Sequence, residues 1–529
     1  MRQLIIIIIL VAGLLVSSAL LIGLNASVAE QDMRPSDRDQ TDQRPRGQGQ
    51  GRGRGEGGLR RRGDFRGGQP QRGEGRGRSG GRQPAGMGEF RTEVPAHPVD
   101  LILGRPTDHS VTLSVLAYED IEGYVAYGTE KGNCSAETPR QSFRQGEPVE
   151  VLIDSLAPNA RYYYQFRPRV TAAATFAGGP ECTFHTSRPP GSTFTFTVTA
   201  DPHLDENTTP ELYRQTLLNA LADGPDFHVD LGDTFMTGKH ASRDEAAKQY
   251  LAQRYYFGLL AHSAPLFLAL GNHDGEDGSR NDGTPDNVAV WSNLMRKRYF
   301  LNPIPDAFYS GNERPDRHAG LLEDYYAWQW GDALFVVLDP FWYNRPKSRG
   351  GDNWGRTLGE EQYHWLKQTL ENSRARFKFV FVHHLVGGAT REGRGGAEAA
   401  RYFEWGGQSL DDSDDFRRER PGWPAPIHRL LMENGVSIVF HGHDHLFAKQ
   451  DLDGIVYQEV PQPGLPRYNT PRTAAEYGYL DGVILGSPGH MRITVSESRL
   501  TADYVRSYLP EDETGDRKNR EVSYSYTIP

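Results

Sequence analysis

The sequence has 529 residues, a formal net charge of −10 and only two cysteines. This length allows two or three domains with a large hydrophobic core. Neither cysteine lies near the N-terminus, which excludes a lipid-modified cysteine as a membrane anchor.

An apolar segment opens the chain. Residues 4–24 carry no charge, and small residues up to Ala29 offer a signal-peptidase site. We therefore predict a signal peptide over residues 1–29 and an exported protein, in the periplasm, outside the cell or on the cell surface. Because an apolar run of this length can also span a bilayer, an uncleaved anchor is the alternative, and only then would the protein contact a membrane.

Residues 30–94 form a segment rich in glycine and arginine, which we predict to be a disordered linker because it has too little apolar surface to bury. Between Arg44 and Arg82, twelve arginines face three acidic residues, a net charge of +9 that leaves −19 on the rest of the chain. A solvated spacer is one interpretation, and contact with a cell-surface polyanion is the other. Specific nucleic-acid binding is not expected of an exported chain.

Residues 95–190 contain short runs of alternating apolar and polar residues between turn signals, which predicts a small all-β sandwich. The stretch from Leu156 to Tyr164 resembles the corner of fibronectin type III modules, where a tyrosine hydroxyl bonds to the backbone. Cys134 and Cys182 both fall in this domain, and a disulfide or two separate thiols are both compatible with the sequence. We expect a structural role for the domain.

From Thr193 onward, buried strands alternate with helices, and five strands end in polar residues. The carboxyl ends of parallel strands in an α/β sheet meet at one edge, where sites form. The most distinctive ending follows residues 436–440, where the apolar run stops at His-Gly-His-Asp-His. Because buried imidazoles need partners, a metal is the simplest explanation, and a solvated polar loop is the alternative. The candidate ligands at the five strand ends are Asp201, His203, Asp233, Asn272, His383, His443 and His445.

These ligands fit two metal ions better than one. Asp201, His203 and His445 can hold one ion, Asn272, His383 and His443 the other, and Asp233 can bridge both. The mixture of carboxylate, amide and imidazole suits two divalent or trivalent transition ions, Fe, Mn, Zn or Co. Two such ions can clamp a phosphoryl group during in-line displacement.

In order, the motifs D-x-H, G-D, G-N-H-D, a strand-end His and G-H-x-H resemble those of the calcineurin-like metallophosphoesterase superfamily. With a fibronectin-like module ahead, the chain resembles the purple acid phosphatase branch. The resemblance implies a four-layer α/β/β/α sandwich over residues 191–507. It also implies hydrolysis of a small-molecule phosphate ester, with a hydroxide held between the metals as the nucleophile.

One position departs from the purple enzymes, which carry a tyrosine ligand in G-D-x-x-Y and glycine in place of the first-block histidine. Here Met236 takes the tyrosine position and His203 is present, so His203 would occupy the vacated ligand position. The chain therefore resembles a non-purple variant.

For several polar residues near the motifs, the sequence leaves two roles open. By resemblance, His273 contacts phosphate and protonates the leaving oxygen, unless it packs on its own loop; Asp274 either orients His273 or caps the loop. His384 is an alternative to His383 as ligand, and His240 and Arg280 either meet the phosphate or are solvated.

Two segments remain outside the motifs. The insertion at residues 387–426 follows His383, and we predict that it is a lid or binding loop over the metals. Residues 508–529 are charged, and we predict a loose tail.

The seven filled ligand positions favour an active enzyme, and the resemblance to acid phosphatases implies a phosphomonoesterase. A phosphodiesterase or nucleotide hydrolase of the same fold is one alternative. A surface-binding protein without activity is the other.

Overall fold

The computed structural model describes residues 89–170, 173, 175–346, 352–390 and 392–529. The predicted signal peptide and residues 30–88 of the predicted linker lie outside the described residues. Within the described ranges, no helix has both the length and the apolar character needed to cross a membrane.

The first folded unit is a sandwich of two antiparallel sheets. One sheet has the order β1-β2-β6, with β1 at Val99–Gly104, β2 at Val111–Ala117 and β6 at Val149–Ile153. The other has the order β4-β3-β7-β8, at Ala136–Glu137, Ile121–Gly128, Arg161–Val170 and Cys182–His185, with β5 at Gln141–Phe143 beside β3. Inward side chains of alternate residues, such as Leu113, Tyr164 and Phe184, form its core.

The predicted tyrosine corner is present in this sandwich. The backbone N–H of Ala157 donates to the Tyr162 hydroxyl at 2.8 Å. Cys134 and Cys182 are free thiols, and Cys182 is buried in the core. Of the two states that the sequence allowed, the structure therefore has separate thiols.

The second unit is built on two further sheets. The six-stranded sheet runs β11 (Leu266–Leu268), β10 (Phe227–Asp230), β9 (Phe194–Thr199), β22 (Gly489–Val495), β23 (Leu500–Arg506) and β24 (Val522–Ile528). The eight-stranded sheet runs β12 (Ser310–Gly311), β15 (Tyr326–Trp330), β16 (Ala333–Val337), β17 (Phe377–Phe381), β18 (Ile438–His441), β20 (Ile455–Glu459), β19 (Phe447–Leu452) and β21 (Val483–Leu485). A small hairpin pairs β13 (Pro315–Asp316) with β14 (Gly320–Leu321).

Aromatic side chains fill the space between these two sheets. Phe196 from the first sheet packs edge-on against Phe335 and Phe379 from the second, with ring centroids 5.2 and 5.3 Å apart. Such edge-to-face pairs are a favoured arrangement of buried rings. The largest core cluster of the protein is therefore the contact between the two sheets.

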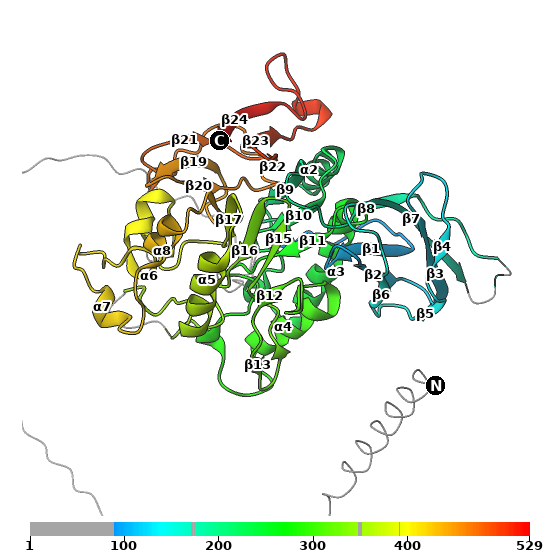
Figure 1. Cartoon of the computed structure of the whole chain (residues 1–529), viewed down its shortest axis with the longest axis horizontal. Helices are drawn as coiled ribbons and strands as arrows, with labels where there is room; N and C mark the ends of the chain where they lie inside the picture. The colour runs from blue at the N-terminus through cyan, green and yellow to red at the C-terminus, as the bar shows by residue number, and fades with distance from the viewer. Residues whose placement is uncertain (1–88, 171–172, 174, 347–351, 391) are drawn as a thin grey trace, which may run out of the picture. The chain divides into compact units, whose positions relative to one another are not determined.

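Helices cover the outer face of each sheet (Figure 1). On the six-stranded sheet lie α2 (Pro210–Ala222), α3 (Arg243–Ala261) and α4 (Val288–Tyr299). On the eight-stranded sheet lie α5 (Glu360–Asn372), α6 (Phe403–Gly406), α7 (Phe416–Glu419) and α8 (Ile427–Glu433). Short 3₁₀ turns are η1 (Thr237–Lys239), η2 (Gly278–Arg280), η3 (Ala397–Arg401) and η4 (Pro510–Asp512). The predicted four-layer α/β/β/α sandwich is confirmed.

The insertion at residues 387–426 differs from the predicted lid over most of its length. Phe403, Trp405 and Phe416 pack into the apolar cluster on the outer face of the eight-stranded sheet. These large apolar side chains would be costly to leave in solvent, so the segment becomes part of the helical layer. Among the described residues of the insertion, Arg394 near its start lies beside the predicted ligand His443.

The C-terminal segment also differs from the prediction. Residues 522–528 form β24, which pairs antiparallel with β23 from Leu500 to Val505. The alternation of Val, Ser, Tyr and Thr in this stretch suits a strand with one covered face. Residues 508–529 are therefore not a loose tail.

Polar contacts join the sandwich to the second unit. Buried Arg254 of α3 donates to the hydroxyl and the carbonyl oxygen of Ser114 at 3.1 and 3.2 Å. The Tyr164 hydroxyl donates to the carbonyl oxygen of His262 at 2.6 Å. Because α3 also supports the loops that follow β9 and β10, the sandwich braces the helix behind the candidate site.

Candidate metal centre

The candidate ligands follow strands whose carboxyl ends point the same way within each sheet. Strands β9, β10 and β11 are parallel in one sheet, and β16, β17, β18 and β20 are parallel in the other. The loops after β9, β10, β11, β17 and β18 carry the seven predicted ligands. The structure brings all seven to one edge, between the ends of the two sheets.

Asp201, His203 and His445 form one group whose ligand atoms all lie within 4.8 Å of one another. The Nε2 atoms of His203 and His445 are 3.5 and 3.6 Å from Asp201 Oδ1. Asp201 adopts a left-handed backbone conformation with φ of +60°, which turns the chain sharply at the strand end. A strained turn is thus used to direct this carboxylate toward the two imidazoles.

A second group consists of Asp233, His383 and His443, again with ligand atoms within 4.8 Å of one another. Asn272 belongs with them, because its Oδ1 lies 3.0 Å from His383 Nε2. Asp233 Oδ2 lies 3.4 Å from His383 Nε2 and 3.6 Å from His203 Nε2. Asp233 therefore stands between the two groups.

Close backbone packing connects the loops. The N–H of His443 donates to Asp201 Oδ2 at 2.8 Å. A Cβ on Gly442 would lie 2.6 Å from the same oxygen, so only glycine fits at this point. The glycine of the His-Gly-His motif thus allows the loop after β18 to approach the loop after β9.

Unsatisfied polar atoms test whether these residues suit metal ions. Asp201 Oδ1, His203 Nε2 and His443 Nε2 are buried and have no hydrogen-bond partner among the described residues. Orphaned buried polar atoms are costly, and here they converge from different strands. A transition ion would satisfy them, since imidazole nitrogen and carboxylate oxygen are its usual donors. The residues present therefore fit metal ions.

Electrostatics set the protonation of the two groups. Burial lowers the pKa of His445 to about 4 and that of His443 well below its usual value, so both are neutral and able to donate a lone pair. Burial also opposes charge on His383, but the Asp233 carboxylate raises its pKa to about 9. Metal binding must displace that proton, which makes the binding pH-dependent.

Outer contacts orient two of the imidazoles. His203 Nδ1 lies 3.2 Å from Asp205 Oδ2, and His383 Nδ1 lies 3.0 Å from the carbonyl oxygen of Leu231. Such partners fix the ring and leave Nε2 free for a metal. Asp205 was missed in the sequence, although its position two residues after His203 was the available signal.

Two glutamines of α3 were also not predicted from the sequence to support the site. Gln249 donates to the carbonyl oxygens of His203 and Thr234, at 2.7 and 2.8 Å. Gln253, one helical turn later, donates to the carbonyl oxygens of Pro202 and Thr234. The helix thereby ties together the loops that follow β9 and β10.

Asp274 is a loop anchor in the structure. Its carboxylate accepts hydrogen bonds from the N–H groups of Gly271, Asp233 and Phe235, at 2.8, 3.1 and 2.7 Å. None of these three hydrogen bonds involves the His273 ring. Of the two roles open in the sequence, loop capping is therefore supported by these contacts, and orientation of His273 stays a prediction.

His273 lies half-buried at the same edge. Its backbone N–H donates to Asp233 Oδ1 at 2.7 Å. Burial lowers the pKa of His273 to about 4; the Asp233 charge opposes this effect and the nearby Lys239 charge adds to it. The ring is therefore neutral at neutral pH, and the charges of Asp233 and Lys239 both act on it.

The remaining candidates occupy different places. His384 turns its Nδ1 toward the carbonyl oxygen of Leu385 at 3.0 Å and belongs to neither ligand group. His240 bonds to Gln249 and stacks on Phe90 with ring centroids 3.9 Å apart. Arg280 is exposed at the end of η2.

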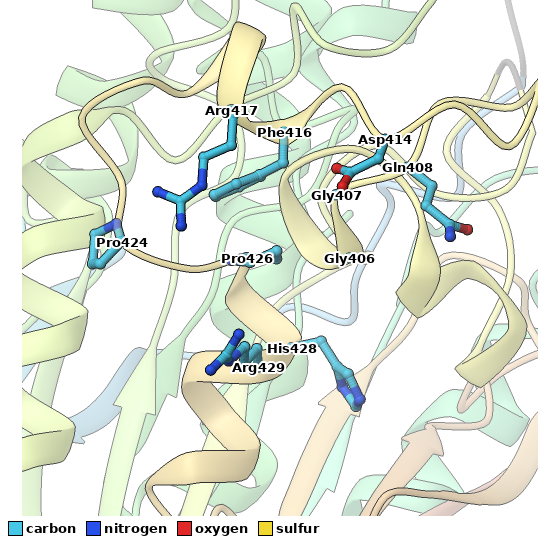
Figure 2. A pocket seen from close by; sticks show the side chains of 10 residues that line it. All are labelled: Gly406, Gly407, Gln408, Asp414, Phe416, Arg417, Pro424, Pro426, His428 and Arg429. Carbon is cyan, nitrogen blue, oxygen red and sulfur yellow. The ribbon is translucent and has the colours of Figure 1, made fainter.

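A cavity of about 380 Å³ lies away from the ligand groups, between the insertion and α8. Figure 2 shows Phe416 and Arg417 on one side of it and His428 and Arg429 on the other. None of the predicted site residues lines it.

Comparison with known proteins agrees with this geometry. The model of the family described as calcineurin-like phosphoesterase matches residues 194–447. The structure of PhoD superposes with a TM-score of 0.59 at 15% identity, over 81% of this chain and 89% of that one. Purple acid phosphatase PPD1 from yellow lupin (Lupinus luteus) seeds gives a TM-score of 0.54 at 16% identity, over 81% of this chain and 73% of that one. The search of curated proteins found no match.

Proposed function

We propose that the chain is an exported enzyme with two metal ions that hydrolyses phosphate monoesters, because residues 194–447 match the model of the calcineurin-like phosphoesterase family. The observation that carries this proposal is the pair of ligand groups with Asp233 Oδ2 between them, 3.6 and 3.4 Å from one histidine of each.

The ligand roles follow from the two groups. Asp201, His203 and His445 would hold one ion. Asn272, His383 and His443 would hold the other, and Asp233 would serve both. This mixture of oxygen and nitrogen donors suits Fe, Mn, Zn or Co.

When bound, two transition ions supply Lewis acidity toward the phosphoryl oxygens and activate water for in-line displacement at phosphorus. The neutral amide of Asn272 limits the negative charge around them. His273 is the proton donor to the leaving oxygen, a role supported by its backbone hydrogen bond to Asp233 at this edge. Because burial lowers the pKa of its ring to about 4, the ring is neutral before substrate binds and has to gain its proton beside the anionic phosphate. Asp274 takes no part in the chemistry and holds the loops after β10 and β11.

A binding protein that has lost its activity is less compatible with the site. Loss of function would leave no reason to keep three buried, unpartnered ligand atoms in the two ligand groups. Retention of these costly groups supports an enzyme.

Export is proposed on the sequence alone, from the apolar segment that ends before Ala29. The arginine-rich linker that follows would act as a spacer or contact a surface polyanion. Cell fractionation with N-terminal sequencing tests both claims, because a mature chain beginning at Glu30 is expected outside the cytoplasm. Recovery of the full-length chain from the cytosol would contradict export.

The enzymatic proposal is tested by metal analysis combined with hydrolysis of 4-nitrophenyl phosphate and bis(4-nitrophenyl) phosphate in the presence of Mn, Zn, Fe or Co. We expect about two transition ions per chain and a higher kcat/KM for the monoester. The variant Asp233→Asn provides the metal-deficient control. Fewer than one ion per chain, or no hydrolysis of either ester, overturns the proposal. A higher kcat/KM for the diester overturns the monoesterase assignment alone.

The visible spectrum gives a separate test of the non-purple assignment. Because Met236 cannot act as a tyrosinate ligand, the iron-loaded protein should lack a tyrosinate-to-iron absorption band. A purple iron form would show that another tyrosine binds the metal.

A further inference from the structure

Two basic side chains stand beside His273 without an acidic partner. Lys239 ends η1 and Arg280 ends η2, and both are exposed. Neither forms an ion pair or a side-chain hydrogen bond with any residue in the described part of the chain. Their charge is therefore available to a ligand.

The position of Arg280 is fixed by the short turn that carries it. Asp277 accepts hydrogen bonds from Ser279 N through its side chain and from Arg280 N through its carbonyl oxygen, both at 2.9 Å. Gly278 N donates to the carbonyl oxygen of Phe341 at 3.1 Å, which docks the turn on the loop after β16. The backbone of Arg280 is thus held in place, which fixes the position of the Cα atom that carries its side chain.

The Arg280 guanidinium lies against Gly238, in the loop after β10. Its Nη1 lies 2.8 Å from the position that a Cβ on Gly238 would take. Gly238 N in turn donates to the carbonyl oxygen of His273 at 2.9 Å. Since Lys239 follows Gly238 directly, both cations adjoin the loop of the proposed proton donor.

A third basic residue at the edge is already neutralised. Arg394 pairs with Asp444 at 2.7 Å and stacks on Tyr477. It lies next to the His443 backbone, which places it beside the loop after β18. Of these three basic residues, the two without a partner among the described residues therefore lie beside the His273 loop.

We propose that Lys239 and Arg280 bind a second phosphate carried by the leaving group, so that the preferred substrates are phosphate esters whose leaving alcohol bears a further phosphate. The inference rests on the proposed function, because it is His273 as proton donor that marks the leaving-group side. A guanidinium matches a phosphate with two parallel hydrogen bonds, and a nearby ammonium adds a point charge.

A matched series of esters of three-carbon alcohols that differ at the far end tests the proposal. Propyl phosphate has a neutral end, 3-(phosphonooxy)propanoate a carboxylate, and propane-1,3-diyl bisphosphate a second phosphate. We expect the metal-loaded parent to prefer the bisphosphate over propyl phosphate by about 10- to 100-fold in kcat/KM, the effect of one or two charge-assisted hydrogen bonds. The carboxylate ester should fall between them. Equal rates for the carboxylate and the bisphosphate would overturn phosphate as the preferred group.

Variants then assign the preference to residues. Arg280→Gln should reduce the bisphosphate-to-propyl ratio about 10-fold, Lys239→Gln about 3-fold, and Arg280→Lys should retain part of it. Arg417→Gln is the matched control, because Arg417 is exposed beside the remote cavity of Figure 2. Its ratio should equal that of the parent. If Arg280→Gln leaves the ratio unchanged, or Arg417→Gln lowers it equally, the assignment is wrong.

Binding provides a readout that does not depend on turnover. By calorimetry, propane-1,3-diyl bisphosphonate should bind the parent more tightly than propylphosphonate does, and Arg280→Gln should remove about 10-fold of that difference. The difference should also shrink at high salt, because both cations are exposed. Hydrolysis of propyl phosphate without any preference would refute this inference and leave the proposed function standing. No hydrolysis of any of the esters would refute the proposed function itself.

Discussion

Replacing Asp274 by alanine distinguishes a loop anchor from a chemical participant. The side chain is fully buried, and its carboxylate is the acceptor for three backbone N–H groups. These belong to Gly271, Asp233 and Phe235. The substitution removes all three acceptors at once and leaves the donors without water.

The expected loss in free energy of unfolding follows from these three hydrogen bonds. Each buried donor left unsatisfied costs about 1–3 kcal/mol, and the three share one site, so about 3–5 kcal/mol is the expected range. Burial and the charge of Asp233 raise the pKa of Asp274 to about 7, which means that the carboxylate is itself costly to bury. The net loss should therefore lie near the lower end, about 3 kcal/mol.

Urea unfolding of the parent, Asp274→Ala and Asp277→Ala measures this effect. Asp277 is the matched control, because it is half-buried and its side chain accepts one hydrogen bond, from Ser279 N at 2.9 Å. Its loss should be about 1 kcal/mol or less. In Asp274→Ala, the metal content should fall together with kcat, because Asp233 loses its support. Unchanged stability and metal content with a large loss of kcat would refute the anchor role and restore a catalytic one.

Four other outcomes are expected. Asp233→Ala should bring the metal content below one ion per chain, because a methyl group cannot balance two cations; retention of two ions would exclude bridging. His273→Ala should keep the parent's metal content and lower kcat about 10²–10⁴-fold on esters with poor leaving groups, and less on 4-nitrophenyl phosphate; equal losses on both esters would contradict proton donation. Burial raises the pKa of Asp223, but His490 and Arg520 more than offset this and lower it to about 2. Asp223→Asn should therefore cost about 1–2 kcal/mol at pH 7, and the difference from the parent should vanish as the pH falls from about 4 to about 2; a pH-independent difference would exclude this linkage. Chelation should lower the unfolding temperature of the parent and leave that of Asp233→Ala nearly unchanged; equal shifts would point to an effect unrelated to the centre.

The fold and the grouping of the seven ligand candidates could be predicted because their signals are local. Runs such as residues 436–440 are apolar and β-branched, and each ends at a polar residue. Once parallel strands are inferred, the rule that their carboxyl ends share an edge brings distant residues together. Asp201 and His445 follow strands of different sheets, so their proximity also required the two-sheet arrangement that the family resemblance implied.

The supporting contacts could not be predicted in this way, because they depend on how separate elements meet. Nothing in the local pattern around Gln249 and Gln253 shows that their amides reach the loops after β9 and β10. Asp274 follows His273 in sequence, which favoured a shared role, yet its carboxylate turns toward the neighbouring backbone. Both roles depend on contacts between elements that lie apart in the sequence, so the residue types alone could not predict them.

The position of β9 within its sheet has a consequence for biosynthesis. Its partner on one side is β10, the next strand in the chain, but on the other side it is β22. Thr195 and Thr494, whose hydroxyls are 3.1 Å apart, are separated by 299 positions. One edge of β9 therefore stays unpaired throughout most of translation, and an open strand edge invites association with other chains. A polypeptide released before β22 would contain every ligand residue and still present that edge to its neighbours.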